Sequence, residues 1–444
     1  MFVVFVLVAV AVVALLAAVH RYVWRRLIGD TTRKGTVARR AGTVAAFVLP
    51  LLSVGALVSS RAGFPFRLQQ VLAWPGYIWL AALLYLTLAL LVGEIVRPLL
   101  RRMLARRAGA ADATAPERAD RPAEAPAEVH AAQVSTPSSG HGGDPGLDTA
   151  PRADSTRTAP PEAPAPAVAD PSRRLFVARA VGGAAALAGL GTVGHGTYGV
   201  LRGPRVKRVT VPLAGLPRGA HRFRIAVVSD IHLGPILGRA HTRRIVDTIN
   251  ATGSDLVAVV GDLVDGSVAD LGSAAEPLAD LEARHGSYFV TGNHEYFSGA
   301  AQWVDHVREL GLHPLENARV EIAGFDLAGV NDVAGESEGQ GPDFARALGD
   351  RDRSRASVLL AHQPVVIDDA VEYGVGLQLS GHTHGGQLWP GNLLAELANP
   401  TVAGLERYGD TQLYVSRGAG AWGPPVRVGA PSDITVVELA SPHA

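Results

Sequence analysis

The sequence predicts an α/β protein in which a mixed α/β domain, built around β-sheet, follows a set of N-terminal transmembrane helices. Three observations lead to this prediction. Residues 1–100 and 175–200 are apolar and contain almost no acids, which is typical of membrane segments. The stretch between them is rich in Pro, Ala and charge. After residue 205, short β-type runs alternate with longer helical ones over a length that can bury a core.

Three apolar runs predict a membrane region over residues 1–105. They extend over Phe2–Val19, Ala41–Val58 and Trp74–Val92, and each is close to the ~20 residues that cross a bilayer. The first run has neither a basic start nor a small-residue cleavage site, so it predicts a retained helix and not a signal peptide.

The loop charges predict how these helices are oriented. The segments that follow the first and third runs are rich in Arg, whereas the loop between the second and third runs holds only Arg61 and Arg67. Because basic loops stay in the cytoplasm, we expect the N-terminus outside and the chain after the third helix inside.

Residues 106–172 predict a disordered linker, because Pro, Ala and charged residues dominate and aromatic side chains are absent. The segment 173–202 begins with Arg173 and Arg174 and continues as a weakly apolar, Gly-rich run. It resembles a twin-arginine export signal, but it also fits a fourth transmembrane helix. Both interpretations send the following domain, residues 203–444, to the extracytoplasmic side of the cell membrane, and they leave open whether the segment is cleaved.

The domain at 203–444 shows an alternation of predicted strands and helices. Helical patterns occupy Thr242–Ala251 and Gln302–Leu310. Strands are predicted at Phe223–Val228, Leu256–Val260, Ser287–Val290, Phe325–Val330, Ser357–Leu360, Leu377–Leu379, Leu413–Ser416 and Asp433–Leu439.

Five of these strands run directly into side chains that bind metals. The motifs are Asp230-x-His232, Gly261-Asp262-x-x-Asp265, Gly292-Asn293-His294-Glu295, Ala361-His362 and Gly381-His382-Thr383-His384-Gly385-Gly386. Ligands gather at the carboxyl ends of strands in open α/β sheets, so we expect these side chains to meet. Imidazole and carboxylate without thiolate suit first-row divalent ions such as Zn, Mn or Fe. The chain has no cysteine, which excludes disulfides, Cys-ligated zinc and cysteine nucleophiles.

The order of these motifs resembles that of the calcineurin-like metallophosphoesterases. The forms Gly-Asn-His-Glu-Tyr and Gly-His-Thr-His-Gly-Gly-Gln are similar to those of the bacterial membrane-associated subgroup of YaeI/YkuE-like phosphodiesterases. The resemblance covers about residues 207–440 and implies a β-sandwich flanked by helices.

The resemblance also implies roles for individual residues around two divalent ions. The first ion would be bound by Asp230, His232 and His384. The second would be bound by Asn293, His362 and His382. Asp262 would bridge both ions, and His294 would donate a proton or hydrogen bond to the scissile phosphate. Asp265 would orient a ligand histidine, and Glu295 would either act similarly or only start a helix.

These residues predict a membrane-anchored, metal-dependent phosphohydrolase. Two divalent ions ~3.5–4 Å apart neutralise a phosphate ester and promote ionisation of the attacking water. A phosphodiester is the favoured substrate, while a monoester or a pyrophosphate stays open. A non-catalytic metal-containing binding or signalling protein is the alternative from another class, and the complete ligand set argues against it.

The expected partners are a phosphate-ester substrate and membrane lipid. Because the net charge is zero, no bulk attraction to nucleic acid is expected. The segment 388–405 holds Trp389, Leu393, Leu394, Leu397 and Leu405. It predicts either an apolar wall that touches lipid, which favours an envelope hydrolase of lipid-linked phosphates or pyrophosphates, or an ordinary packed loop. The oligomeric state stays open.

Overall fold

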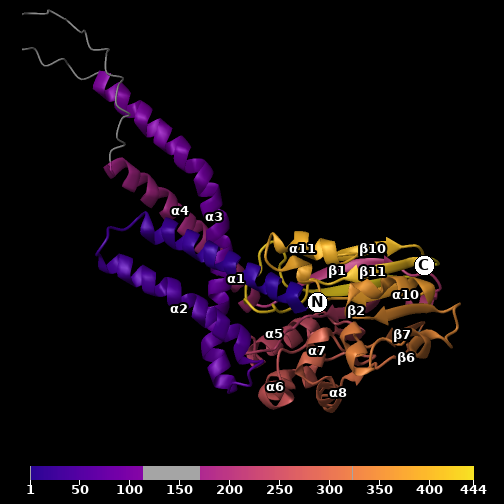
Figure 1. Ribbon diagram of the computed structural model, residues 1–444. Helices are drawn as coiled ribbons and strands as arrows, with labels where there is room; N and C mark the ends of the chain where they lie inside the picture. Colours follow the sequence, from indigo (N-terminus) through magenta and orange to yellow (C-terminus); the bar gives the residue numbers. More distant parts are fainter. Residues whose placement is uncertain (1, 114–170, 323) are drawn as a thin grey trace, which may run out of the picture. The chain divides into compact units, whose positions relative to one another are not determined.

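The computed structural model describes residues 2–113, 171–322 and 324–444 (Figure 1). The linker predicted at 106–172 therefore lies outside the described residues except at its two ends. Pro98–Val177, which includes the end of one helix and the start of the next, forms a unit separate from the rest of the chain.

Four long helices precede the sheets. They are α1 (Phe2–Trp24), continued by a π-helical turn at Arg25–Gly29, α2 (Val37–Ser59), α3 (Phe66–Ala113) and α4 (Pro171–Leu201). All four are long and apolar enough to cross a membrane. The α3 helix extends beyond residue 105, where the linker was predicted to begin, because Ala and Arg, which dominate that stretch, are strong helix formers.

Glycines allow α4 to approach its neighbours closely. A Cβ atom at Gly189 would lie 3.0 Å from the backbone nitrogen of Leu86 in α3. A Cβ atom at Gly93 of α3 would lie 2.7 Å from Val181 of α4. Such small residues are typical of helix interfaces in membranes, where close packing replaces the hydrophobic effect.

The second half of the chain folds into two six-stranded sheets. The first has the order β1-β12-β2-β3-β4-β5 and is parallel except for the β12–β2 pair. Its strands are β1 (Arg205–Pro212), β2 (Phe223–Val228), β3 (Leu256–Val260), β4 (Ser287–Val290), β5 (His313–Pro314) and β12 (Asp433–Ala440).

The second sheet has the order β10-β11-β9-β8-β7-β6, and its outermost pair at each edge is antiparallel. Its strands are β6 (Ala318–Ile322), β7 (Phe325–Gly329), β8 (Ala356–Leu360), β9 (Leu377–Ser380), β10 (Gly404–Tyr408) and β11 (Thr411–Val415). All eight predicted strands are confirmed within a residue or two. The strands β1, β5, β6 and β10 were not predicted.

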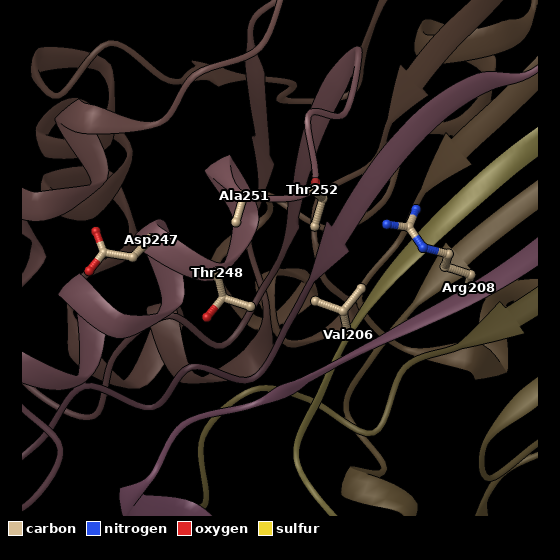
Figure 2. A pocket seen from close by; sticks show the side chains of 6 residues that line it. All are labelled: Val206, Arg208, Asp247, Thr248, Ala251 and Thr252. Carbon is tan, nitrogen blue, oxygen red and sulfur yellow. The ribbon is translucent and has the colours of Figure 1, made fainter.

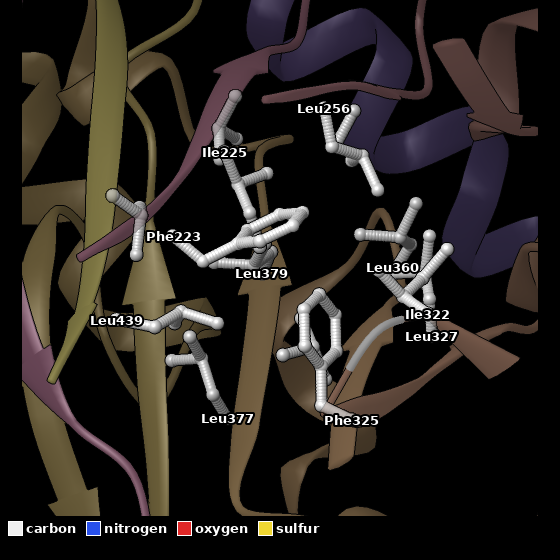
Figure 3. Packing of buried hydrophobic residues seen from close by; sticks show 14 of the residues in the cluster. Phe223, Ile225, Leu256, Ile322, Phe325, Leu327, Leu360, Leu377, Leu379 and Leu439 are labelled. Atoms are coloured by element: carbon white, nitrogen blue, oxygen red, sulfur yellow. The ribbon is translucent and has the colours of Figure 1, made fainter. Parts of the chain in front are cut away.

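The two sheets pack face to face around an apolar core (Figure 3). Phe223 and Leu256 of the first sheet meet Phe325, Leu360 and Leu379 of the second. The Phe223 and Phe325 rings make an edge-to-face contact with centroids 5.1 Å apart. The predicted β-sandwich is confirmed.

Helices cover the outer faces of both sheets. Those that pack on the first sheet are α5 (Arg239–Asn250), α6 (Val268–Ala275) and α8 (Ala300–Glu309). Those that pack on the second sheet are α9 (Phe344–Leu348) and α10 (Ile367–Glu372). Two further helices, α7 (Asn293–Ser298) and α11 (Gly391–Ala398), follow strand ends. Short 3₁₀ turns occupy Arg218–Ala220, Glu276–Asp280, Val333–Glu338, Pro364–Val366 and His384–Gly386. Because helices and the other sheet cover both of its faces, β3 is uniformly apolar, and β2 is apolar except for Arg224.

Candidate metal centre

The ends of five central strands bring the predicted metal ligands into one cluster. One group of ligand atoms comes from Asp230, His232, Asp262 and His384, and all its atoms lie within 4.8 Å of one another. A second group, held to the same limit, comes from Asp262, His362 and His382. Asp262 belongs to both groups, as expected of a residue that bridges two ions. The ligand roles themselves stay predictions.

The predicted amide ligand joins the second group. The Asn293 side-chain oxygen lies 3.0 Å from Nδ1 of His382. Asn293 is the first residue of α7, directly after β4, whereas His382 follows β9 in the other sheet. The cluster therefore spans the ends of both sheets.

The backbone at the cluster is strained. Five non-glycine residues of the cluster adopt left-handed φ angles: Asp230 (51°), His232 (49°), Asp262 (53°), His382 (71°) and His384 (52°). Each such residue costs on the order of 1–3 kcal/mol, which the surrounding structure must offset. Residues held in this way concentrate at functional sites.

Glycines next to the ligands leave room for them. A Cβ atom at Gly261, whose φ is +71°, would lie 2.6 Å from the His362 ring. A Cβ atom at Gly381 would lie 2.5 Å from the Asp230 carboxylate. Any side chain at these two positions would displace a predicted ligand. Steric crowding therefore explains why the motifs have glycine there.

The environment of His362 fits a bound cation. Its Nδ1 lies 2.9 Å from the carbonyl oxygen of Val260, which can only accept, so Nδ1 carries a proton. Its Nε2 is buried, lies 3.1 Å from Oδ2 of Asp262 and has no hydrogen-bond partner. A proton on Nε2 would thus make no aligned hydrogen bond, while a divalent ion beside both atoms would satisfy the imidazole and the carboxylate together.

Metal binding requires ionised carboxylates and neutral imidazoles, and the protonation states meet this requirement only in part. Burial alone would lower the pKa values of His232 and His362, but Asp265 and Asp262 raise them, that of His232 to about 9, so these two imidazoles must release a proton when a metal binds. Burial raises the pKa of Asp230. Burial alone would raise the pKa of Asp262, but His362 and His232 hold it well below its usual range. Burial lowers the pKa of His382 to about 4, and burial with the nearby His232 and Arg427 lowers the pKa of His384.

Comparisons with known proteins agree with this geometry. The family model described as calcineurin-like phosphoesterase matches residues 223–386. A Helicobacter pylori protein named an uncharacterized metallophosphoesterase is 38% identical over 256 residues, which cover 57% of this chain and 68% of that protein. The chain belongs to the calcineurin-like metallophosphoesterases.

Two other metallophosphoesterases are also similar to this chain. A Danio rerio protein named "Transmembrane protein with metallophosphoesterase domain" is 38% identical over 259 residues, which cover 55% of this chain and 59% of that protein. YkuE of Bacillus subtilis, named an uncharacterized metallophosphoesterase, is 29% identical over 289 residues, covering 61% of this chain and 98% of YkuE. The predicted family is confirmed. The match covers only 59% of the length of the Danio rerio relative.

His294 and Asp265 stand beside the ligands of the metallophosphoesterase cluster. Nδ1 of His294 lies 2.6 Å from Oδ1 of Asp265, and the same oxygen lies 2.9 Å from Nδ1 of His232. Burial would raise the pKa of Asp265, but His232 and His294 lower it to about 2. One ionised carboxylate therefore orients both His232, a predicted ligand, and His294, the predicted proton donor.

Glu295 supports the cluster by binding the backbone of the loop that carries Asp262. Its buried carboxylate accepts hydrogen bonds from the backbone N–H groups of Asp262 (2.9 Å), Leu263 (2.7 Å) and Gly292 (2.6 Å). Burial and the nearby Asp262 raise its pKa to about 7. Glu295 lies in the first turn of α7 and holds the loop after β3 through backbone N–H groups, whereas the hydrogen bonds described for it reach no histidine.

Arg427 lies next to the cluster although no sequence motif predicted it. This buried guanidinium donates to the carbonyl oxygens of Gly420 (2.7 Å), His384 (3.0 Å) and Ala430 (3.1 Å). Its Nη2 also lies 3.2 Å from Nδ1 of His384. An arginine within a Gly-rich, apolar stretch was the only signal available in the sequence.

Figure 2 shows six residues that line a pocket of about 510 Å³. It is lined by Val206, Arg208, Asp247, Thr248, Ala251 and Thr252, which belong to β1, to α5 and to the residues after α5. None of the predicted site residues lines it. This pocket is therefore separate from the predicted metal ligands.

Proposed function

We propose that this protein is a membrane-anchored, metal-dependent phosphohydrolase that uses two divalent ions and prefers phosphodiesters. The observation that carries the proposal is Asp262, which is shared by two ligand groups and faces the unpartnered Nε2 of His362. The phosphodiester preference rests on the similarity of the Gly-Asn-His-Glu-Tyr and Gly-His-Thr-His-Gly-Gly-Gln motifs to those of the YaeI/YkuE-like subgroup.

Two divalent ions, when bound, neutralise the charge of a phosphate group and promote ionisation of a water molecule. One ion would be held by Asp230, His232 and His384, the other by Asn293, His362 and His382, and both by Asp262. Mn, Zn and Fe all suit this donor set, so the native metals stay open.

His294 would act on the substrate through Nε2. Its Nδ1 is 2.6 Å from the Asp265 carboxylate, which fixes the ring and stabilises a positive charge on it. The imidazole can then donate a proton or hydrogen bond to an oxygen of the scissile phosphate as the leaving group departs.

The four apolar helices support a multi-pass membrane protein. The Arg-rich segments after the first and third helices favour a topology in which the catalytic domain lies on the extracytoplasmic side. We favour α4 as a retained fourth span over a cleaved twin-arginine signal. Gly189 packs closely on α3, and the backbone N–H of Arg427 donates to the carbonyl of Gly196 at 3.4 Å.

The test is hydrolysis of bis-p-nitrophenyl phosphate and p-nitrophenyl phosphate by the full chain, stripped of metal and then given Mn or Zn. We expect metal-dependent turnover of the diester, lost in Asp262→Asn and reduced about 10²–10⁴-fold in His294→Ala, the range for a general acid. Asp410→Asn, which changes an exposed surface acid, should keep full activity. A folded, metal-loaded chain that cleaves neither compound would favour the non-catalytic binding protein.

A further inference from the structure

The α11 helix presents an apolar surface that nothing in the described chain covers. None of its residues is buried, and Leu394 and Leu397 are 72% and 85% exposed. Leu393 of the same helix, Trp389 just before it, and Trp422 are exposed as well. We call these five side chains the apolar lip. Contiguous exposed apolar side chains mark binding surfaces in folded proteins.

The apolar lip adjoins the metal centre. The α11 helix follows the turn that carries His384, and a Cβ atom at Gly386 would collide with Asn392 of α11. Gln387 holds Trp422 in place by accepting its backbone N–H at 3.0 Å and donating to its carbonyl at 2.9 Å. The Trp422 ring stands edge-on to that of His294, with centroids 5.7 Å apart.

The apolar lip is also continuous with the transmembrane helices. The Tyr85 hydroxyl of α3 donates to the carbonyl oxygen of Trp389 at 2.9 Å. Leu388 and Val428 pack into an apolar cluster that includes Leu86 and Leu90 of α3.

The contact with Tyr85 indicates how deep in the bilayer the apolar lip lies. Tyr85 lies eleven residues into the run Trp74–Val92, or roughly 16 Å along the helix at 1.5 Å per residue. That is about the middle of a hydrocarbon layer ~30 Å thick. If α3 crosses the bilayer, the backbone of Trp389, two residues before α11, lies at the depth of Tyr85.

We propose that the apolar lip lies in the extracytoplasmic leaflet and that the substrate is a phosphate ester carried by a membrane lipid. The hydrocarbon of the lipid would lie against the lip while its phosphate reaches the metal centre. This proposal rests on the phosphohydrolase activity proposed above. In the reaction the oxygen of water bonds to phosphorus, one ester P–O bond breaks, and the leaving oxygen takes a proton.

The lipid fits this surface better than a protein partner does. Tryptophans gather where lipid meets water, and an amphipathic helix with leucines on one face settles in the same layer. The carbonyl of Trp389 is already satisfied by Tyr85, as a carbonyl at that depth requires. A second copy of the chain or another protein on the apolar lip are outcomes that the experiment distinguishes.

The depth can be measured directly because the chain contains no cysteine. Leu394→Cys and, as a control, Val371→Cys on the exposed side of α10 would each carry a nitroxide in the full chain. The protein would be reconstituted into phosphatidylcholine–phosphatidylglycerol vesicles. We expect the label at 394 to be relaxed by oxygen more than by a soluble nickel chelate, and the label at 371 to show the reverse. Nickel access at 394 equal to that at 371, or protection from both reagents by a covering protein, overturns the proposal.

Hydrolysis tests the substrate class. The double variant Leu393→Ser with Leu394→Ser should cleave phosphatidylglycerol in vesicles about tenfold more slowly, because lipid contact depends on buried apolar area. Its rate on soluble bis-p-nitrophenyl phosphate should be unchanged. The control, Val365→Ser with Val371→Ser, should change neither rate.

The outcomes separate the two proposals. Equal loss on both substrates in the double variant overturns the lipid contact. A wild-type chain that cleaves the soluble diester but no vesicle lipid overturns the lipid substrate and leaves the phosphohydrolase intact. A wild-type chain that cleaves neither compound with any metal fails as a phosphohydrolase, whereas the nitroxide depth still reports on the apolar lip.

Discussion

Arg427 connects His384 to Gly420 and Ala430 through one guanidinium. Its Nε and Nη1 donate to the carbonyls of Gly420, His384 and Ala430, and its Nη2 lies 3.2 Å from Nδ1 of the His384 ring. Burial lowers the pKa of Arg427 to about 10, which still keeps the side chain charged at neutral pH. A planar, forked donor fits this arrangement in a way that a lysine ammonium cannot.

Arg427→Lys should therefore loosen His384 without removing the positive charge. We expect the affinity for the ion beside His384 to fall about ten- to a hundredfold, which is usual for partners that orient a metal ligand. Calorimetric titration of the stripped full chain with Mn or Zn measures this. Arg407→Lys, on the exposed surface, is the matched control. Unchanged metal affinity in Arg427→Lys would show that the guanidinium does not orient His384 for metal binding.

The residues of the cluster could be predicted because each follows an apolar run within a short motif. Arg427 could not, because its contacts join segments whose proximity depends on the completed fold. The left-handed backbone at Asp230 and His384 was equally hidden, since it opposes the local preference of these residue types. Short sequence motifs predict which side chains reach the site. The hydrogen bonds and backbone angles that hold those side chains depend on tertiary packing.

Among the elements, the central strands were predictable and the edge strands were not. Strands such as Leu256–Val260 are buried on both faces and read as uninterrupted apolar runs. The edge strands Arg205–Pro212, Ala318–Ile322 and Gly404–Tyr408 carry charged, exposed residues and depend on their neighbours for pairing. The exposed leucines of α11 were singled out in sequence, but their depth became apparent only through Tyr85 of a distant helix.

The α4 helix contacts the catalytic domain at a glycine. A Cβ atom at Gly196 would lie 2.7 Å from Val426 and 2.8 Å from the carbonyl oxygen of Arg427. A Cβ atom at Gly194, two residues away, would have no atom within 4 Å. The same helix therefore offers a position that should resist enlargement and a neighbouring one that should tolerate it.

Gly196→Leu should push α4 away from the loop at Val426 and destabilise the protein by about 1–3 kcal/mol, as overpacking does. Gly194→Leu should leave stability unchanged. Thermal unfolding of both full-length variants in detergent measures the difference in melting temperature. An equal shift in the two variants would mean that helix propensity, and not this contact, determines the effect.

At the scale of the whole molecule, one ionic cluster marks the expected cytoplasmic end of the helices. Arg26 is paired with Asp30 (2.9 Å) and with Glu94 of α3 (2.7 Å), and Tyr22 donates to Glu94 at 2.9 Å. Glu94, the acid at the edge of the third span, is thus neutralised by a basic residue of the first loop. This arrangement favours one boundary plane through α1 and α3, with the basic loops on the cytoplasmic side.

The resulting topology makes opposite predictions for two exposed positions. Lys34, in the loop between α1 and α2, should face the cytoplasm, whereas Glu282, in the catalytic domain, should face outward because α4 recrosses the membrane. Since the chain has no cysteine, Lys34→Cys and Glu282→Cys can each be labelled alone with a membrane-impermeant maleimide. In right-side-out membrane vesicles, we expect the label at 282 before permeabilisation and at 34 only afterwards. The reverse pattern would place the catalytic domain in the cytoplasm and move the proposed lipid substrate to the inner leaflet.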